Sequence, residues 1–285
     1  MAVPRPTRIA AFAAYEVRRA LARKKVIAIA AFTVILVTAP YFILSTLGPS
    51  DVPASLFPFV WVVGAIAPFN LFIQLIGILI AAGAMSEEYE AGTAELLLSK
   101  PVSRTEFFVG KYLGGYFLLA VMITLDVGLS IVSASLTYGP QMGLETVPGL
   151  LVVEILASAL FYSVAFTLGE LVRRSSLAYI LASAFVVSSQ FIGTFLVIAY
   201  EITGKALYQT IHVYLPTTVA GSIPTQFEQP LLPSTAGRVF SLILGPSAGV
   251  PSQATAAAIV AAYFVVAMAI SLGYFRWADV SRRVN

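Results

Sequence analysis

Residues 87–111 concentrate ionisable side chains in a sequence that is otherwise strongly apolar. They read EEYEAGTAELLLSKPVSRTEFFVGK and hold five of the fourteen acidic residues of the chain. Carboxylates at this density can pair with cations, favour the positive end of a helix dipole or take part in acid–base catalysis. The residues around them decide between these uses.

The patterns that would support catalysis are incomplete. Glu87 and Glu88 match the first half of the EExxxR pattern of intramembrane proteases, but Gly92 stands where that pattern needs arginine. The sequence has no HExxH pattern and no nucleophile paired with a histidine. The phosphate-binding pattern GxxxxGK followed by Ser or Thr is also absent, because Gly110-Lys111 precedes Tyr112. We therefore expect no enzymatic activity and no ATP site on this chain.

Metal ions, cofactors and nucleic acid are not expected as ligands. The chain has no cysteine and a single histidine, His212, whereas structural and catalytic zinc sites need several such ligands. The net charge of +3 comes from basic residues that flank apolar runs and form no patch with interleaved aromatics.

The composition instead indicates an integral membrane protein. Of the 285 residues, 59% are apolar and 11% are charged, and the mean hydropathy is +0.89. A soluble domain carries about 25% charged residues. A helix needs about 20 apolar residues to cross the hydrocarbon. We predict an all-α polytopic fold in a single transmembrane domain, 1–285, with six spans at 26–47, 59–85, 112–138, 148–172, 177–200 and 254–275.

The distribution of Lys and Arg predicts that both termini are cytoplasmic, because positive residues are retained on that side. Seven precede the first span, three lie between the second and third, two between the fourth and fifth, and three follow the sixth, which places fifteen of the seventeen on one side. The other side has only Lys205 and Arg238. The expected location is the plasma membrane.

Two segments outside the spans also have a predicted structure. Residues 1–25 form an amphipathic interfacial helix, with Ile9, Val17 and Leu21 on its apolar face and Arg18 and Arg19 turned toward lipid phosphates. The external loop 201–253, which carries six prolines, is long enough to hold one or two short helices at the membrane surface.

The acidic stretch itself, 86–111, is predicted as a cytoplasmic loop containing a short helix. Ser86 is a candidate N-cap for Glu87, Glu88 and Glu90, and Gly92 weakens the helix that follows. Thr93 restarts a helix over 94–99, and Pro101 ends it. Ser103 and Glu106 form a capping box that starts the third span.

This stretch resembles the first cytoplasmic loop of the membrane subunits of ABC transporters of the type-two exporter family. The matching pattern is an acidic pair, Gly-Thr, Glu, Leu-Leu-Ser, Pro-Val-Ser-Arg and Gly-Lys. The six spans, the interfacial helix and the long external loop extend the resemblance over the whole chain. In general appearance the chain is similar to single-domain permeases, some of which serve in the maturation of multicopper enzymes. The residues that carry the match are Glu87, Glu88, Gly92, Thr93, Glu95, Leu97, Leu98, Ser99, Pro101, Val102, Ser103, Arg104, Gly110 and Lys111.

The resemblance implies a mechanism and partners. The short helix would be a coupling helix that docks on a separate ABC ATPase subunit, which binds ATP and Mg and drives the membrane half between inward and outward states. A second permease chain, identical or related, would complete the translocation path. The ATPase-docking residues would be Glu87, Glu88, Gly92, Thr93, Glu95, Leu97, Leu98, Pro101 and Arg104.

Polar residues inside the spans leave an alternative open. Asp126 and Glu154 fall within the third and fourth spans, where an unpaired carboxylate costs several kcal/mol. They either serve an ion-coupled secondary transporter or channel, or fix helix contacts beside Asn70, Gln74 or Gln190.

Overall fold

The structure is a computed structural model that describes residues 6–22, 24–46, 54–99, 102–232 and 250–277. Within these residues the regular structure is all helical and contains no strand, which confirms the all-α prediction. The elements are α1 (Pro6–Ala22), α2 (Lys24–Ser45), η1 (Ala54–Phe59), α3 (Val60–Pro68), η2 (Phe69–Ile73), α4 (Gln74–Ala91), α5 (Thr93–Leu98), α6 (Arg104–Tyr138), η3 (Leu144–Thr146), α7 (Val147–Val172), α8 (Ser175–Thr203), α9 (Ala206–Val213), α10 (Pro216–Glu228), η4 (Gln229–Leu231) and α12 (Gln253–Trp277).

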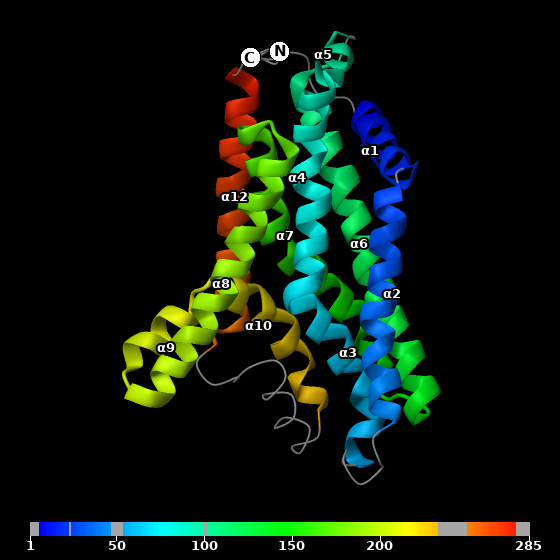
Figure 1. Cartoon of the computed structure of the whole chain (residues 1–285), viewed down its shortest axis with the longest axis vertical. Helices are drawn as coiled ribbons and strands as arrows, with labels where there is room; N and C mark the ends of the chain where they lie inside the picture. Colours follow the sequence, from blue (N-terminus) through cyan, green and yellow to red (C-terminus); the bar gives the residue numbers. More distant parts are fainter. Residues whose placement is uncertain (1–5, 23, 47–53, 100–101, 233–249, 278–285) are drawn as a thin grey trace.

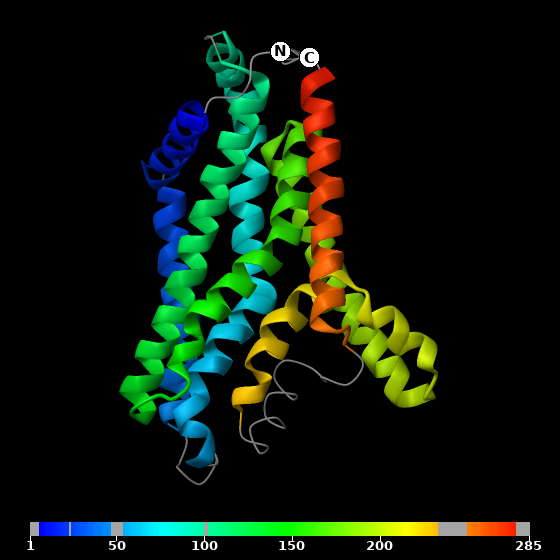
Figure 2. The same ribbon diagram turned by 180° about the vertical axis from the view of Figure 1, so that it is seen from behind.

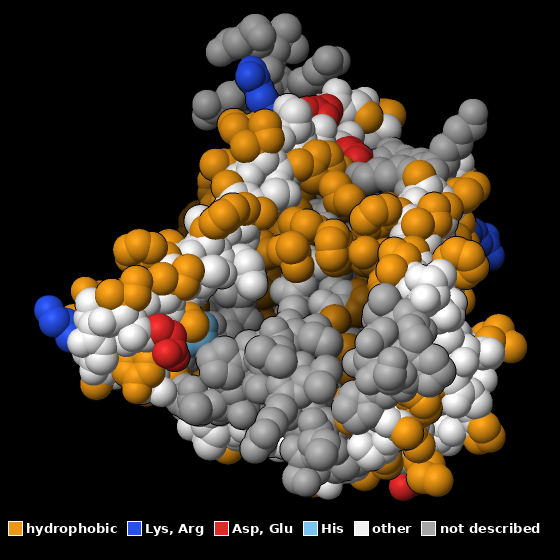
Figure 3. Space-filling view, turned by 60° about the horizontal axis from the view of Figure 1, so that its bottom comes forward, with side chains coloured by type: hydrophobic (Ala, Val, Ile, Leu, Met, Phe, Trp, Pro, Cys, Tyr) orange, Lys and Arg blue, Asp and Glu red, His pale blue; other side chains and the backbone are white. Residues whose placement is uncertain are grey.

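Six helical segments of the described residues are long and apolar enough to cross a membrane, as the sequence predicted. They are Val26–Ile43, Ala54–Ala91, Arg104–Tyr138, Leu144–Val172, Ser175–Thr203 and Gln253–Trp277. α4 and α7 form the centre of the bundle, with α6 and α2 on one side and α8 and α12 on the other (Figures 1 and 2). The outside is apolar: hydrophobic side chains cover much of the face in Figure 3. Such a surface suits contact with lipid acyl chains.

The second span changes its helical geometry at a proline. Pro68 ends α3, and the next five residues, Phe69–Ile73, form a π-helical turn before α4 continues. Proline has no N–H to donate and clashes with the preceding turn, so a wider turn here relieves the backbone. The π turn after Pro68 thus interrupts the regular α-helix within one continuous span.

A hydrogen-bond network fixes α2 and α3 on α6 near the far end of the bundle. The Tyr41 hydroxyl lies 2.6 Å from Ser130 Oγ, which donates to the Trp61 carbonyl oxygen at 2.6 Å. Trp61 is fully buried, and its Nε1 donates to the Met142 carbonyl at 2.8 Å. Buried polar groups in a membrane need such partners, because no water is available to them.

Helix α1 lies obliquely beside the bundle, near the end that carries α5, and packs against α6 (Figure 1). Two glycines of α6 allow the close approach: a Cβ on Gly114 would lie 2.7 Å from the Ala13 carbonyl oxygen and from Glu16 Cβ. A Cβ on Gly110 would lie 3.0 Å from the Ile9 carbonyl oxygen. The pair of glycines four residues apart thus acts as a helix-packing surface.

The interfacial-helix prediction was wrong in one respect, the direction of Arg19. This side chain is only 13% exposed and lies between α1, α4 and α6, in ion pairs with carboxylates. Leu21, which the pattern placed on the apolar face, is exposed, as a side chain directed toward lipid would be. The cause of the inward direction of Arg19 is tertiary: α1 packs on α6, and buried carboxylates attract Arg19 inward.

The long connection after α8 contains two short helices, α9 and α10, as the sequence predicted; residues 233–249 of that loop lie outside the described part. α9 projects away from the bundle, and α10 turns back toward its axis (Figures 1 and 2). Ser189 Oγ and Thr217 Oγ1, 2.9 Å apart, join α8 to the start of α10. At the other end of α10, Thr146 Oγ1 donates to the buried Glu228 carboxylate at 3.3 Å.

Glu228 gives the fold a pH dependence. Burial raises the pKa of its carboxyl from 4.5 to about 7, and Glu145 adds to the rise. The folded protein therefore binds this proton more tightly than the unfolded chain, so the contribution of Glu228 to stability is greatest below pH 4.5 and falls as the pH rises toward 7. Glu154 also lies within electrostatic range of Glu228.

The first prediction concerns Gly114. Gly114→Ala places a Cβ against backbone atoms of α1, and overpacking of this kind costs about 1–3 kcal/mol, so we expect a lower unfolding temperature in detergent. The matched control is Gly128→Ala on the same helix, where an added Cβ meets nothing within 4 Å. An unfolding temperature that falls equally in both variants would contradict this packing.

The second prediction concerns pH. Between pH 4.5 and 7 the unfolding temperature of the wild-type protein should fall more than that of Glu228→Gln, because glutamine cannot lose a proton. Thermal unfolding of both proteins over this pH range measures the difference. Equal pH dependence in the two proteins would show that Glu228 is not responsible.

Candidate functional site

The acidic residues of the stretch begin within a membrane-spanning helix. α4 continues without a break through Ser86 to Ala91, and the Ser86 hydroxyl donates to the Ala82 carbonyl oxygen at 2.6 Å. The prediction that Ser86 caps a new helix was therefore wrong. A hydroxyl buried in a helix finds its nearest acceptor one turn back, so serine can lie inside a helix as well as at its start.

Gly92 separates α4 from the short helix α5. Its backbone is left-handed, with φ 69° and ψ 9°, and its N–H bonds back to the Glu88 and Tyr89 carbonyls. A Cβ on Gly92 would meet no atom within 4 Å, so the requirement for glycine comes from the backbone conformation. The Thr93 hydroxyl donates to the Glu88 carboxylate across this turn. This turn therefore fixes the direction of α5 relative to α4.

α5 lies beyond the end of the bundle, at the end that also carries α1 and the last turn of α12 (Figure 1). We call this the α5 end. Among the side chains of α5, Ala94 is buried and Leu97 packs against the core. Glu95 and Leu96 are exposed, and the exposed fraction of Leu96 is 69%. The side chain of Leu98 and the whole of Pro101 lie outside the described part of the structure. The outward face of α5 therefore includes one carboxylate and one leucine.

The start of α6 fixes the other side of α5. Ser103 Oγ accepts from the Glu106 N–H at 3.1 Å, and the Ser103 N–H donates to the Glu106 carboxylate at 2.8 Å, which confirms the capping box. Arg104 Nη1 donates to the carbonyl oxygens of Phe275 and Arg276 at 3.1 and 3.2 Å. This arginine thus ties α6 to the last turn of α12.

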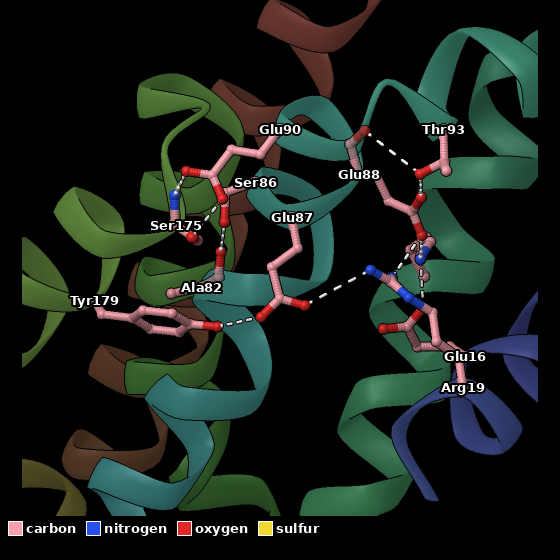
Figure 4. A network of polar contacts seen from close by, with 11 residues as sticks. Glu16, Arg19, Ala82, Ser86, Glu87, Glu88, Glu90, Thr93, Ser175 and Tyr179 are labelled. Atoms are coloured by element: carbon pink, nitrogen blue, oxygen red, sulfur yellow. Dashed lines mark hydrogen bonds and ion pairs between the residues drawn. The ribbon is translucent and has the colours of Figure 1, made fainter. Parts of the chain in front are cut away.

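A buried ion cluster lies beneath α5 and joins α1, α4 and α6 (Figure 4). Lys111, fully buried on α6, donates to Glu88 on α4 at 2.5 Å and to Glu16 on α1. Arg19 on α1 pairs with Glu88 at 2.5 Å and with Glu87 at 3.6 Å. Removing one member of such a buried set leaves an uncompensated charge, at a cost of about 3–5 kcal/mol.

Other residues of the stretch join α4 to α7 and α8. Glu87 accepts from the Tyr179 hydroxyl at 2.6 Å, and Glu90 accepts from the Ser175 N–H at 2.9 Å at the start of α8 (Figure 4). The Tyr89 hydroxyl donates to both carboxylate oxygens of Glu170 on α7 at 2.8 Å. The clustering of acids in the sequence is thus explained in large part by contacts between helices.

The proposed docking residues therefore divide into two groups. Glu87 and Glu88 point into the bundle, Gly92 and Thr93 build the turn, and Leu97 packs on the core. Glu95 and Arg104 are exposed, and exposed Leu96 joins them. The run of three leucines already indicated that one of them is exposed, because three successive residues cannot all share one side of a short helix. The structure identifies Leu96 as an exposed leucine of this run.

Five polar residues predicted within the spans are not brought together as one site. Asp126 and Glu154 are fully buried, and neither carboxylate has a hydrogen-bond partner. Gln74 is likewise buried without one. Asn70 lies against Gly221 of α10, whereas Gln190 is exposed near the middle of α8. Glu154 is within electrostatic range of Asp126 and of Glu228. Glu228 belongs to the loop 201–253, outside the predicted spans.

The described residues contain no group of three His, Cys, Asp or Glu side chains arranged to hold a metal ion. His212 on α9 has Thr218 as its neighbour, at 3.3 Å from Nε2.

Comparison with known proteins agrees with this arrangement. A family model described as "ABC-2 family transporter protein" matches residues 10–280. No curated protein matches the chain in sequence. Because the family match covers nearly the whole chain and six apolar helices accompany it, the chain belongs to the ABC-2 transporter family and is a multi-pass membrane subunit of an ABC transporter.

Proposed function

We propose that this chain is the membrane-spanning subunit of an ATP-driven exporter and that α5 is the surface on which a separate ABC ATPase docks. The observation that supports this most directly is the exposed Glu95 and Leu96 on a short helix beyond the end of the bundle. A leucine that is 69% exposed next to a carboxylate suits an apolar pocket with a basic rim on the partner.

The connections of α5 suit the transmission of force. The left-handed turn at Gly92 joins it to α4, and the capping box at Ser103 begins α6 just after it. Beneath it, Lys111 holds α4, α6 and α1 together through buried ion pairs. A displacement of α5 would therefore move three helices as a unit, which a flexible connection would not do.

The positive residues support a cytoplasmic position for the α5 end. Fifteen of the seventeen Lys and Arg residues fall in segments that the six spans place on one side. Retention of positive charge in the cytoplasm supports a cytoplasmic position for both termini and α5, and the location we propose is the plasma membrane. ATP and Mg bind on the partner subunit, since this chain lacks a phosphate-binding loop.

A second permease chain, identical or related, completes the path. Gln190 supports this step: its amide is exposed near the middle of α8, among exposed Val187, Phe191 and Ile198. An amide that faces hydrocarbon is costly, because lipid offers no hydrogen-bond partner. Cover by a second chain, or by water in a path between two chains, would remove that cost.

The third prediction tests docking. Leu96→Asp and Glu95→Lys should each abolish co-purification with the ATPase, because loss of a central anchor costs 2 kcal/mol or more, about 30-fold in affinity. The control is Glu201→Lys, an equal charge reversal at an exposed residue of α8 near α9, which should leave co-purification unchanged. Full binding by both α5 variants would exclude docking at this surface.

An ion-coupled transporter or channel is the second candidate function. The buried carboxylates of Asp126 and Glu154, which have no hydrogen-bond partner, favour it, because groups of this kind line ion paths in other membrane proteins. It differs from the exporter in needing no ATPase.

The fourth prediction separates these two functions. Proteoliposomes that contain this chain without an ATPase should show no more proton or sodium flux than empty vesicles under an imposed ion gradient, and Asp126→Asn and Glu154→Gln should behave identically. Fluorescent pH and sodium indicators inside the vesicles measure the flux. Flux in the wild-type protein that either substitution removes would support the ion-coupled function instead.

A further inference from the structure

Helix α8 is less covered by the bundle than its neighbour α7. In the most apolar part of α8, 28% of the residues are buried, against 56% in the span that contains α7. The side of α8 that packs on α4, α7 and α10 is a line of small or apolar residues: Ala178, Ala182, Val186, Ser189, Gly193 and Leu196. The exposed remainder of α8 faces either lipid or another protein.

This exposed remainder has two faces of different character. One face consists of large apolar side chains with exposed fractions of 41–78%: Leu177, Leu181, Phe195 and Ile202. The other face alternates between polar and apolar residues along the helix: Ser176, Ile180, Ser183, Val187, Gln190 and Thr194. Five of these six are exposed, and Ser183 is half-buried. The first face suits acyl chains, and we call the second the α8 seam.

The α8 seam has the spacing of a helix-packing surface. Ser176, Ser183 and Gln190 are seven residues apart, and Ile180, Val187 and Thr194 repeat at the same interval. Alternating steps of four and three residues stay on one side of an α-helix and form the seam along which two helices pack with a left-handed twist. The small serine side chains would let a second helix approach closely.

Gln190 is the member of the seam that lipid accommodates least. The hydroxyls of Ser188 and Thr194 donate to carbonyl oxygens of their own helix, at 3.2 and 3.1 Å, so each is satisfied within α8. The Gln190 amide is exposed near the middle of α8, and acyl chains offer it neither a donor nor an acceptor. A surface that covers the seam must therefore supply both groups at this depth.

A second copy of the chain supplies both groups at the required depth. Two copies that cross the membrane in the same direction are related by a two-fold axis perpendicular to it, so their α8 helices run parallel. Residues of a parallel seam then meet their own counterparts, and Gln190 faces the partner subunit's Gln190. An amide is both donor and acceptor, so this pair is self-complementary. Residues 175–200 contain no charged side chain that would repel its counterpart.

We propose that the α8 seam binds a second copy of this chain in register, with the two Gln190 amides hydrogen-bonded to each other at the two-fold axis. The inference rests on the second permease chain of the proposed function and specifies it: the partner is identical, and α8 makes the contact. The seam is then closed to water at the level of Gln190.

Single-cysteine cross-linking tests the register, and the natural chain has no cysteine to interfere. Val187→Cys, Gln190→Cys and Thr194→Cys of the full chain are oxidised in membranes, and covalent dimers are measured by electrophoresis. A disulfide needs Cα atoms within about 7 Å, so these variants should cross-link about tenfold faster than the controls. The controls are Leu181→Cys and Phe195→Cys on the lipid-facing side of the same helix.

The amide pair is tested by Gln190→Leu, which keeps a side chain of similar size. Loss of a hydrogen bond between helices in a membrane should weaken dimerisation in detergent about threefold to thirtyfold. Gln190→Asn, which keeps the amide, should lose less, and Phe195→Leu on the lipid-facing side should dimerise as the wild type does. Analytical ultracentrifugation measures the equilibrium.

Three results would overturn the proposal. The first is equal cross-linking at the seam and at the lipid-facing controls in a chain that is dimeric, which would leave the second permease chain in place but move the contact elsewhere. The second is rapid labelling of Gln190→Cys by a charged, membrane-impermeant thiol reagent, which would show that the seam lines a water-filled path. The third is a chain that is monomeric in the membrane, which would also remove an identical second chain from the proposed function. Co-purification with the ATPase tests docking at α5 independently of all three.

Discussion

A lysine ammonium without access to solvent is stable only where carboxylates surround it, and Lys111 imposes this condition on three helices. Glu88 from α4 and Glu16 from α1 approach it, and Arg19 balances the second carboxylate charge. The pairs can form only if α1 lies on α6. Gly110 and Gly114 permit that approach because neither presents a Cβ to α1. The same pairs fix the position of α5, because α5 connects α4 to α6, the two helices that Lys111 and Glu88 hold together.

The same arrangement explains why an apolar protein has so many acids in one short stretch. Glu87 bonds to α8 and α1, Glu88 to α6 and α1, and Glu90 to α8, while Glu106 closes a capping box. Glu95 lies on the exposed face of α5. A surface for a partner and the framework that carries its movement are therefore built from one segment.

The far half of the molecule has a different character. There the second span bends through a π turn after Pro68, and α10 turns back toward the bundle with Glu228 buried at its end. Asp126 and Glu154 lie between these elements without hydrogen-bond partners. The two ends thus differ in the partners of their carboxyl groups. Glu88 at the α5 end forms ion pairs, whereas Asp126 and Glu154 have no hydrogen-bond partner.

Features that depend on neighbouring residues could be read from the sequence. Apolar runs gave six spans, because the free energy of transfer into lipid is a property of each side chain. The Ser103–Glu106 capping box and the break at Gly92 were also predictable, since both are made within one turn of helix. Contacts between residues from distant segments were not predictable in this way. Lys111 donates to Glu16, 95 positions away, and Arg19 points inward although its helical pattern predicted the opposite direction. Only the packing of α1 on α6 decides these pairs, because ion pairing depends on distance in space.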